Sequence, residues 1–254
     1  MSLPLLRPAW TVPPGVGAAM SLRDGGVSEG LYTSLNLGVA VGDDPETVVE
    51  NRARYAAALG ARPVWLRQVH GTQVLRLTAA GADAAVTPAD AAWTDEPGLA
   101  CTVQVADCLP VLFSLRDGRA VAAAHAGWRG LAAGVLEATV DALCAGADAR
   151  PADVQVWLGP CIGPRQFEVG ADVLRAFSQV PGQADPQRFV YREWPDGAPR
   201  WLANLQRLAR DRLVAAGVGA VSATEACTVE DDSAFFSFRR DGVTGRMAAA
   251  IWRV

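Results

Sequence analysis

The sequence lacks an excess of positive charge. Its 254 residues carry a formal net charge of −4, and its isoelectric point lies near 5.2. Nucleic-acid binding depends on a basic face that neutralises phosphate groups, so we expect no nucleic-acid partner. Hydrophobic residues make up 50% of the chain and charged residues 20%, as in an ordinary globular protein with a substantial core.

The sequence also lacks a long apolar run. The first residues, MSLPLLRPAWTVPPG, have no apolar core behind a basic start, and no later segment is long enough to span a bilayer. The five cysteines are an odd number and few for this length, so we expect no disulfide framework. These absences predict a cytoplasmic protein with reduced thiols and no membrane partner.

Histidine is scarce. His70 in RQVHG and His125 in HAGWRG are the only two in the chain. A multi-copper oxidase needs many histidines for its trinuclear cluster, so the count excludes genuine laccase chemistry. Two histidines and a cysteine also suit blue copper, but no methionine lies in a loop beside Cys108.

Capping and turn residues divide the chain into helices and strands. Asp44 can cap a helix that starts at Pro45 and ends at Gly60. Further helices are expected at about 131–144, 169–180 and 201–216. Strands are expected at 64–66, 73–77, within 99–125, and at 154–158, 235–238 and 246–252. Residues 78–98 are expected to form a loop near the site. Hairpins mixed with helices indicate a mixed α/β protein with much antiparallel sheet, and no linker divides residues 1–254, so we expect a single domain.

One hairpin has a predictable register. Asp117-Gly118 stands between two apolar runs, which is a strong signal for a tight turn. A two-residue turn pairs Arg116 with Arg119, so that the numbers of paired residues sum to 235. The first strand of this hairpin begins near Cys108, and the second ends near His125.

This register brings Cys108 and His125 to one face. Pro110 lies opposite His125, and Cys108 lies two residues beyond Pro110, roughly 7–8 Å from His125 between Cα atoms. One metal ion with bonds of about 2.0–2.3 Å to nitrogen and sulfur can bridge that gap. His70 cannot be placed by the same argument, because only the fold can bring it near.

Three candidate ligands, His70, Cys108 and His125, suggest a catalytic zinc site with an open fourth position. Such an ion activates water and polarises substrate atoms. Two alternatives stay open: Cys108 can be a small buried hydrophobe beside structural histidines, or it can be the nucleophile of a metal-free hydrolase or deamidase with His125 as its base. A non-catalytic binding protein is a third hypothesis.

Several arginines favour an anionic substrate. The candidates are Arg67, Arg129, Arg239, Arg240 and Arg246, and backbone N–H groups at 126–130 add a potential anion seat. Each arginine can equally be a solvated surface residue. Asn36 in TSLNLG is either a substrate-binding residue or a turn former that hydrogen-bonds its own backbone.

The segments QVHG, ADCLPVL, HAGWRG, GPCIGP and SFRRDGVTGR closely resemble the YfiH-like family, also called the laccase-domain or polyphenol-oxidase-like family. The resemblance extends from TSLNLG to the last strand. It implies a four-layer α/β/β/α sandwich of the CNF-toxin/YfiH-like type and a zinc site made by His70, Cys108 and His125. Cys161 in GPCIGP and Trp93 in DAAWTD depart from the family pattern, and Trp93 lies where it can reshape the pocket.

The resemblance also implies an activity. Family members are described as purine nucleoside phosphorylases, which convert adenosine, inosine and methylthioadenosine with phosphate to a free base and ribose 1-phosphate, and as adenosine deaminases. Purine nucleosides and phosphate would be the small-molecule partners, and copper appears in the older naming. The chain has no His-x-Glu of the kind used by zinc deaminases, so proton transfer would fall to Asp90, Asp95, Asp107 or Glu168. Of these, Asp90 is also a candidate substrate-binding residue.

Overall fold

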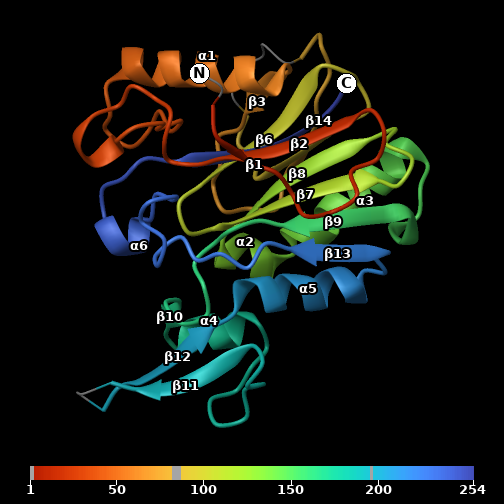
Figure 1. Cartoon of the computed structure of the whole chain (residues 1–254). Coiled ribbons are helices and arrows are strands. Elements are labelled where there is room, and N and C mark those ends of the chain that lie inside the picture. Colours follow the sequence, from red (N-terminus) through yellow and green to blue (C-terminus); the bar gives the residue numbers. More distant parts are fainter. Residues whose placement is uncertain (1–2, 82–86, 195–196) are drawn as a thin grey trace.

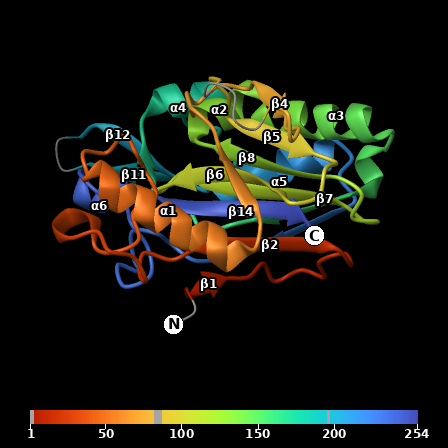
Figure 2. The same cartoon turned by 90° about the horizontal axis from the view of Figure 1, so that it is seen from above.

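The computed structural model describes residues 3–81, 87–194 and 197–254. Two large β-sheets lie face to face between layers of helices, with α1 on one side and α3 and α5 on the other (Figures 1 and 2). This arrangement matches the predicted mixed α/β fold with much antiparallel sheet. The assignment of residues 1–254 to a single domain stays a prediction.

The first large sheet has five strands in the order β1-β2-β14-β6-β3. All neighbouring pairs are antiparallel except β3 and β6, which are parallel. The strand β14 lies in the middle of this sheet although it is the last strand in sequence. The bounds are β1 (Leu5–Leu6), β2 (Val16–Ser21), β3 (Arg62–Trp65), β6 (Leu99–Val105) and β14 (Met247–Arg253).

The second large sheet has six strands in the order β13-β9-β7-β8-β5-β4. Its central pairs are antiparallel, and its outer pairs, β13 with β9 and β4 with β5, are parallel. The bounds are β4 (Val74–Arg76), β5 (Ala91–Thr94), β7 (Leu109–Leu115), β8 (Val121–Ala126), β9 (Val154–Leu158) and β13 (Ala220–Ala223).

A third, small sheet projects from this body at the bottom of Figure 1. It contains β10 (Glu168–Val169), β12 (Pro199–Ala203) and β11 (Phe189–Glu193) in that order. The α-helices of the described residues are α1 (Pro45–Leu59), α2 (Trp128–Ala133), α3 (Val135–Ala147), α4 (Ala171–Ala176), α5 (Leu205–Ala215) and α6 (Phe238–Asp241), with single 3-10 turns η1 (Gly30–Tyr32) and η2 (Pro151–Asp153). None of the helices in these ranges has the length and apolar character that crossing a membrane requires.

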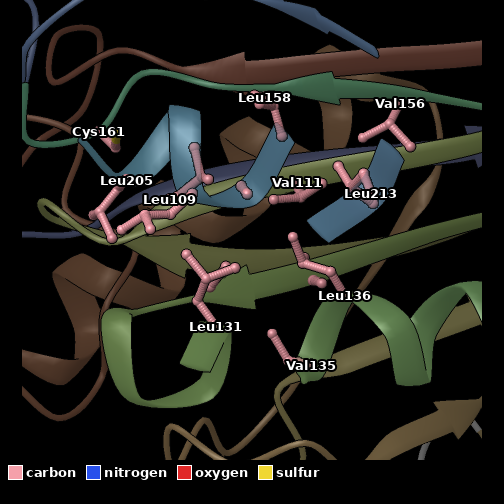
Figure 3. Packing of buried hydrophobic residues seen from close by; sticks show 14 of the residues in the cluster. Leu109, Val111, Leu131, Val135, Leu136, Val156, Leu158, Cys161, Leu205 and Leu213 are labelled. Carbon is pink, nitrogen blue, oxygen red and sulfur yellow. The ribbon is translucent and has the colours of Figure 1, made fainter. Parts of the chain in front are cut away.

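Alternation along the strands creates three hydrophobic layers. In β7, Leu112 points into the space between the two large sheets, whereas Val111 and Phe113 point outward and pack with α3 and α5. Figure 3 shows side chains of α2, α3 and α5 meeting β7 and β9 in this outer layer. On the other side, Tyr55 and Leu59 of α1 pack on β6 and β14. Because both faces of both sheets are covered, the chain has the predicted order of helix, sheet, sheet and helix.

The predicted helix after Asp44 is confirmed. The Asp44 side chain accepts a hydrogen bond from the backbone of Thr47, and Pro45 is the first helical residue. Gly60 ends α1 with a left-handed backbone (φ 66°), a conformation that glycine adopts without steric cost.

The hairpin register is also confirmed. Pro110 pairs with His125, and Leu109 pairs with Ala126, so the residue numbers sum to 235. The loop is wider than the predicted two-residue turn, because the last backbone bond joins Leu115 to Ala120 and only Gly118 has a positive φ (73°). The loop is one residue longer on each side than predicted, so the paired residue numbers still sum to 235.

Three predicted elements were wrong in extent. The helix expected at 131–144 is divided into α2 and α3 at Gly134, which has a φ of 101°. The helix expected at 169–180 is shortened to the six residues of α4. The helix expected at 201–216 begins only at Leu205, because 199–203 form β12 and Asn204 caps α5 by accepting from the backbone of Arg207.

Two further predictions were wrong in kind. The expected loop at 78–98 contains the buried strand β5, whose alanines give no periodic signal; its residues 82–86 lie outside the described ranges. The expected strand at 235–238 is irregular, with Ser237 capping α6. Trp93 lies in β5 and packs against Gly146 of α3, where a Cβ would come within 2.1 Å of the indole ring.

Candidate metal centre

The three candidate ligands lie where the chain connects the two large sheets. His70 lies between β3 of the five-stranded sheet and β4 of the six-stranded sheet. Cys108 lies in the tight connection from β6 to β7, which makes the same crossing. His125 is in β8, next to β7. The fold therefore supplies His70 through a crossing that the hairpin argument could not predict.

These side chains converge. One ligand atom from each of His70, Cys108 and His125 lies within 4.8 Å of the others, and Cys108 Sγ is 3.8 Å from His70 Nε2. The two imidazole rings meet edge to face with centroids 4.8 Å apart. His125 is buried, Cys108 is half-buried and His70 is exposed, so the group is open to solvent on the His70 side.

Asp90 positions both histidines. Its buried carboxylate accepts hydrogen bonds from the backbone N–H groups of Val69 (3.1 Å), His70 (2.8 Å) and Gly71 (2.7 Å). It also bonds His125 Nδ1 at 2.8 Å. Wrapping of the 69–71 backbone around the carboxylate accounts for the left-handed conformation of His70 (φ 60°). An aspartate on Nδ1 leaves Nε2 of His125 to face the other two ligands.

Asp107 anchors the turn that carries Cys108. Asp107 has a φ of 90°, rare for a residue with a side chain, and Cys108 follows directly. Its carboxylate accepts from Thr228 Oγ1 (2.6 Å), Ser237 Oγ (2.7 Å) and the backbone N–H of Arg239 (2.6 Å). Segments more than 100 residues away in sequence thus hold the β6–β7 connection in place.

Two glycines give the site its close packing. A Cβ on Gly127 would lie 2.6 Å from His70 Cδ2 and 3.0 Å from Cys108 Sγ. A Cβ on Gly130 would lie 3.0 Å from the carbonyl oxygen of Gly71. The glycines of HAGWRG therefore allow the start of α2 to approach the loop that carries His70.

The site favours a thiolate. Burial alone would raise the pKa of the Cys108 thiol, but the neighbouring His125 and His70 side chains outweigh it and lower that pKa to about 6. Burial alone would lower the pKa of His125, but Cys108 and Asp90 raise it to about 9. In the metal-free site, both shifts favour a thiolate on Cys108 and an imidazolium on His125.

The donor set fits a metal ion. A thiolate and two imidazole nitrogens suit zinc, and copper also accepts such ligands. Three protein ligands leave one coordination position for substrate or water. The Asp90–His125 contact is the outer partner that metal-binding histidines usually have. His70, Cys108 and His125 would hold the ion.

The predicted anion-binding arginines are spread around the site. Arg67 and Arg129 are exposed, and neither side chain makes a hydrogen bond within the described part of the chain; Arg129 stacks over Trp128 at 4.4 Å. Arg239 is exposed and donates to the carbonyl oxygens of Gln166 and Glu168. The substrate role of these three stays a prediction.

Three predicted substrate residues make several hydrogen bonds within the protein. Arg240 donates to the carbonyl oxygens of Thr228, Val229 and Phe235 and to the Asp241 carboxylate, which uses its guanidinium fully. Asn36 is fully buried, and its amide bonds Gly38, Asp43 and the backbone of Arg246. The carboxylate oxygens of Asp90 already accept the four hydrogen bonds described above. These contacts occupy the polar atoms of all three side chains. Their assignment to substrate stays a prediction.

Three of the four candidates for proton transfer are also held in contacts within the protein. Asp90 and Asp107 are engaged as described, and Asp95 pairs with Arg76 on the surface at 3.0 Å. Glu168 lies in β10 of the small sheet. Neither Asp90 nor Asp107 is placed as a free acid or base.

Arg246 directly precedes β14, and the register of this strand places it near Asp107 and Cys108. Met247 pairs with Val105, so Arg246 stands one step further, opposite Ala106 and beside Asp107. Its Nη1 donates to the carbonyl oxygens of Thr244 and Gly245, while Nε and Nη2 have no partner among the described residues. Burial lowers the pKa of this half-buried group, although the charges of Cys108, Asp107 and Tyr32 oppose that shift.

Sequence reasoning missed Thr228 and Ser237, which hold Asp107, because no local pattern distinguishes a hydroxyl that reaches a residue 121 or 130 positions away. It also missed the positioning role of Asp90. The sequence around Asp90 contains no motif for that role; the only signal is an aspartate that directly precedes the short apolar run Ala91–Trp93.

Comparison with known proteins gives consistent matches. A sequence profile described as "Multi-copper polyphenol oxidoreductase laccase" matches residues 17–254. Purine nucleoside phosphorylase YfiH of Escherichia coli (strain K12) is 49% identical over 252 residues, which cover 98% of this chain and 99% of that protein. A purine nucleoside phosphorylase of Pseudomonas aeruginosa is 50% identical over 248 residues, 97% of each chain. The crystal structure of a Neisseria meningitidis protein superposes with a TM-score of 0.89, at 45% identity and 98% coverage of both chains.

Proposed function

This chain belongs to the laccase-like family that includes the YfiH purine nucleoside phosphorylases, and we propose that it is a zinc-dependent enzyme of that kind. Its substrates would be adenosine, inosine and methylthioadenosine with phosphate, and it would also deaminate adenosine. The observation that carries this proposal is the convergence of His70, Cys108 and His125 on one open position.

A zinc ion bound there would supply a Lewis acid beside the substrate. The residues of the chain hold the three ligands in position. Asp90 fixes the ring orientation of His125, and Asp107 fixes the turn before Cys108, so the ligand atoms are in place before an ion or substrate arrives. Such preorganisation avoids a reorganisation cost during the reaction.

Phosphorolysis also requires a place for phosphate. A phosphate oxygen replaces the purine at C1′ of the ribose, and the electron pair of the broken C1′–N9 bond goes to the purine, which takes up one proton. Arg246 is half-buried beside Asp107 and has free Nε and Nη2 donors within the described chain. A guanidinium with two free N–H groups matches the geometry of a phosphate. We therefore assign phosphate binding to Arg246 rather than to Arg240.

The direct test is product release from inosine. Zinc-loaded protein with inosine and phosphate should release hypoxanthine and ribose 1-phosphate, measured by chromatography. His70→Ala and Cys108→Ala should abolish release, whereas Cys144→Ala, which changes a thiol on α3, should retain it. Absence of base release from inosine, adenosine and methylthioadenosine by zinc-loaded protein would refute the proposal.

The thiolate–imidazolium pair favours a second candidate, a metal-free cysteine hydrolase or deamidase. In that enzyme Cys108 attacks the substrate and His125 handles the proton. Metal analysis of purified protein separates the two. One equivalent of zinc that is lost in Cys108→Ala supports the phosphorylase, and metal-free active protein with a covalent adduct on Cys108 supports the hydrolase.

A further inference from the structure

A cavity lies outside the candidate metal centre. It has a volume of about 500 Å³ and is bounded by residues 161–165, the start of α5 and residues 223–230. None of the three metal ligands lines it. Its size falls in the range of small-molecule sites. The proposed phosphorylase reaction assigns no role to it.

Two guanidinium groups line this cavity from one face of α5. Arg207 and Arg210 are three positions apart, which places them on neighbouring turns of the same face. Arg207 uses Nε to bind Asp211, and Arg210 uses Nη1 to bind the carbonyl oxygen of Val221. Their other N–H groups have no partner among the described residues. Both side chains are half-buried, so their orientation is restricted before any ligand binds.

The charged side chains of the lining are partly paired. Arg165 donates to both carboxylate oxygens of Glu230, at 3.0 and 2.6 Å, and this contact holds the pKa of Glu230 down at about 2. That pair is therefore neutral as a unit. Arg207 pairs with Asp211 at 2.9 Å through Nε alone, so its Nη groups stay available. Arg210 has no acidic partner among the described residues, and Glu225 is an exposed carboxylate of the lining.

From the cavity and its unused guanidinium groups we infer that this is a second binding site, for a small phosphate-bearing molecule. Planar guanidinium groups with free N–H pairs bind phosphate oxygens in a fork, which lysine cannot reproduce. The two nearby amides add little, because Gln206 already donates to Gly159 and Thr224, and Asn204 caps α5.

The site also contacts the framework of the metal centre. Cys161 and Cys227 line the cavity and pair in an isolated β-bridge. The next residue after each, Ile162 and Thr228, bonds Asp107, the neighbour of Cys108. Occupation of the cavity would therefore restrict the same segments that anchor the Cys108 turn.

Equilibrium dialysis with labelled inorganic phosphate and with labelled 5′-AMP tests this inference. The parent protein carries Arg246→Ala, which removes the phosphate contact proposed for the metal centre. We expect one equivalent of phosphate or AMP to bind to this parent. Binding of inorganic phosphate identifies the free anion as sufficient, and binding of AMP alone identifies a phosphate ester as the ligand.

Variants then locate the bound molecule. Arg207→Ala with Arg210→Ala should weaken binding by roughly 10-fold or more, and Arg54→Ala, which changes an exposed arginine paired with Glu50, should leave it within about 2-fold. Arg210→Gln, which retains a donor for Val221, is the variant to use if the double change unfolds the protein. Failure of both probes to bind, or binding unchanged in the arginine variants, overturns the inference. Neither outcome depends on phosphorolysis, which is assayed separately.

Discussion

At the scale of single residues, Asp90 connects the two histidines through four hydrogen bonds. Burial opposes ionisation of its carboxylate, but the bonds from His125, Gly71 and Val69 outweigh it and lower the pKa of Asp90. The carboxylate therefore stays charged and keeps Nε2 of His125 directed at the metal position. We therefore assign it a positioning role, since all four of these contacts are to the segments that carry His70 and His125.

Replacing Asp90 by Asn should separate this role from catalysis. The amide NH₂ would face backbone N–H donors that need acceptors, so we expect zinc affinity to fall about 10- to 100-fold and stability to fall by about 1–3 kcal/mol. Competition with a chelator measures the affinity. Asp95→Asn, at an exposed ion pair, is the matched control. Unchanged zinc affinity in Asp90→Asn would contradict this assignment.

Cys108 should ionise at an unusually low pH in metal-free protein. Its pKa is lowered from 9.0 to about 6, so the thiolate is present above pH 6 and lost as the pH falls through that value. Alkylation of Cys108 by iodoacetamide, followed by mass spectrometry, should show a midpoint near pH 6. The denatured protein should show one near 9, and added zinc should slow the native reaction. A native midpoint near 9 would show that the His125 pairing is absent.

Arg246 is the residue on which phosphate binding should depend. Arg246→Ala should raise the KM for phosphate by roughly 10- to 100-fold, the value of one or two hydrogen bonds to a charged group. The KM for inosine should change little. Arg246→Lys, which retains the charge but not the fork, should be intermediate, and Arg54→Ala should behave as wild type. Equal increases in both KM values would argue against a specific phosphate contact.

At the scale of elements, the sequence predicted local geometry well and long-range geometry poorly. The Asp117-Gly118 turn and the alternation of two apolar strands sufficed to place Pro110 opposite His125. His70 was a candidate ligand by residue type, but the hairpin argument could not place it beside the other two, because its position depends on a crossing between sheets. The strand β12 was mistaken for helix because the cap that begins α5, Asn204, was not recognised.

The same limit applies to polar residues. Asn36, Arg240 and Asp90 have the side chains that ligand sites use, but in the folded chain their polar atoms bond other groups of the protein, near and far in sequence. The Arg246 backbone that Asn36 binds is 210 residues away. A sequence shows the donor types and not whether they are already satisfied, so these residues were assigned to substrate.

The start of α2 allows a test of close packing at this scale. Gly127→Ala should displace His70 and Cys108, because its methyl group would lie 2.6 and 3.0 Å from their atoms. We expect zinc affinity to fall by roughly 10-fold or more, as for loss of an outer partner. Gly71→Ala, whose methyl would come no nearer than 3.6 Å to its neighbours, is the control. Equal zinc affinity of the two variants would show that the site tolerates the added group.

At the scale of the whole molecule, the candidate metal centre lies where the two large sheets are connected. His70 and Cys108 lie on two separate connections between the sheets, and His125 lies within the second sheet. An ion bound by all three side chains would therefore link segments that are otherwise held by packing. The folded chain, and not the unfolded one, presents the ligands together.

Metal binding should consequently stabilise the fold. Zinc at 100 times its Kd adds about 2.7 kcal/mol to the free energy of unfolding. At roughly 2–4 °C per kcal/mol for a chain of this size, the Tm should rise by about 5–10 °C. Calorimetry with and without a chelator measures the rise, and Cys108→Ala should abolish it. A chelator-insensitive Tm in zinc-loaded protein would mean that the ion does not link the sheets.

The position of β14 has a consequence for biosynthesis. This strand lies between β2 and β6, yet the ribosome adds its residues after those of every other strand in the sheet. All three metal ligands have been translated by residue 125, about halfway along the chain. Until residues 228–239 emerge, Thr228, Ser237 and Arg239 cannot secure Asp107, and until Met247–Arg253 emerges, β2 and β6 have no common neighbour. Nascent or prematurely terminated chains would thus contain every ligand without an assembled centre, so metal uptake would report that translation had reached the final strand.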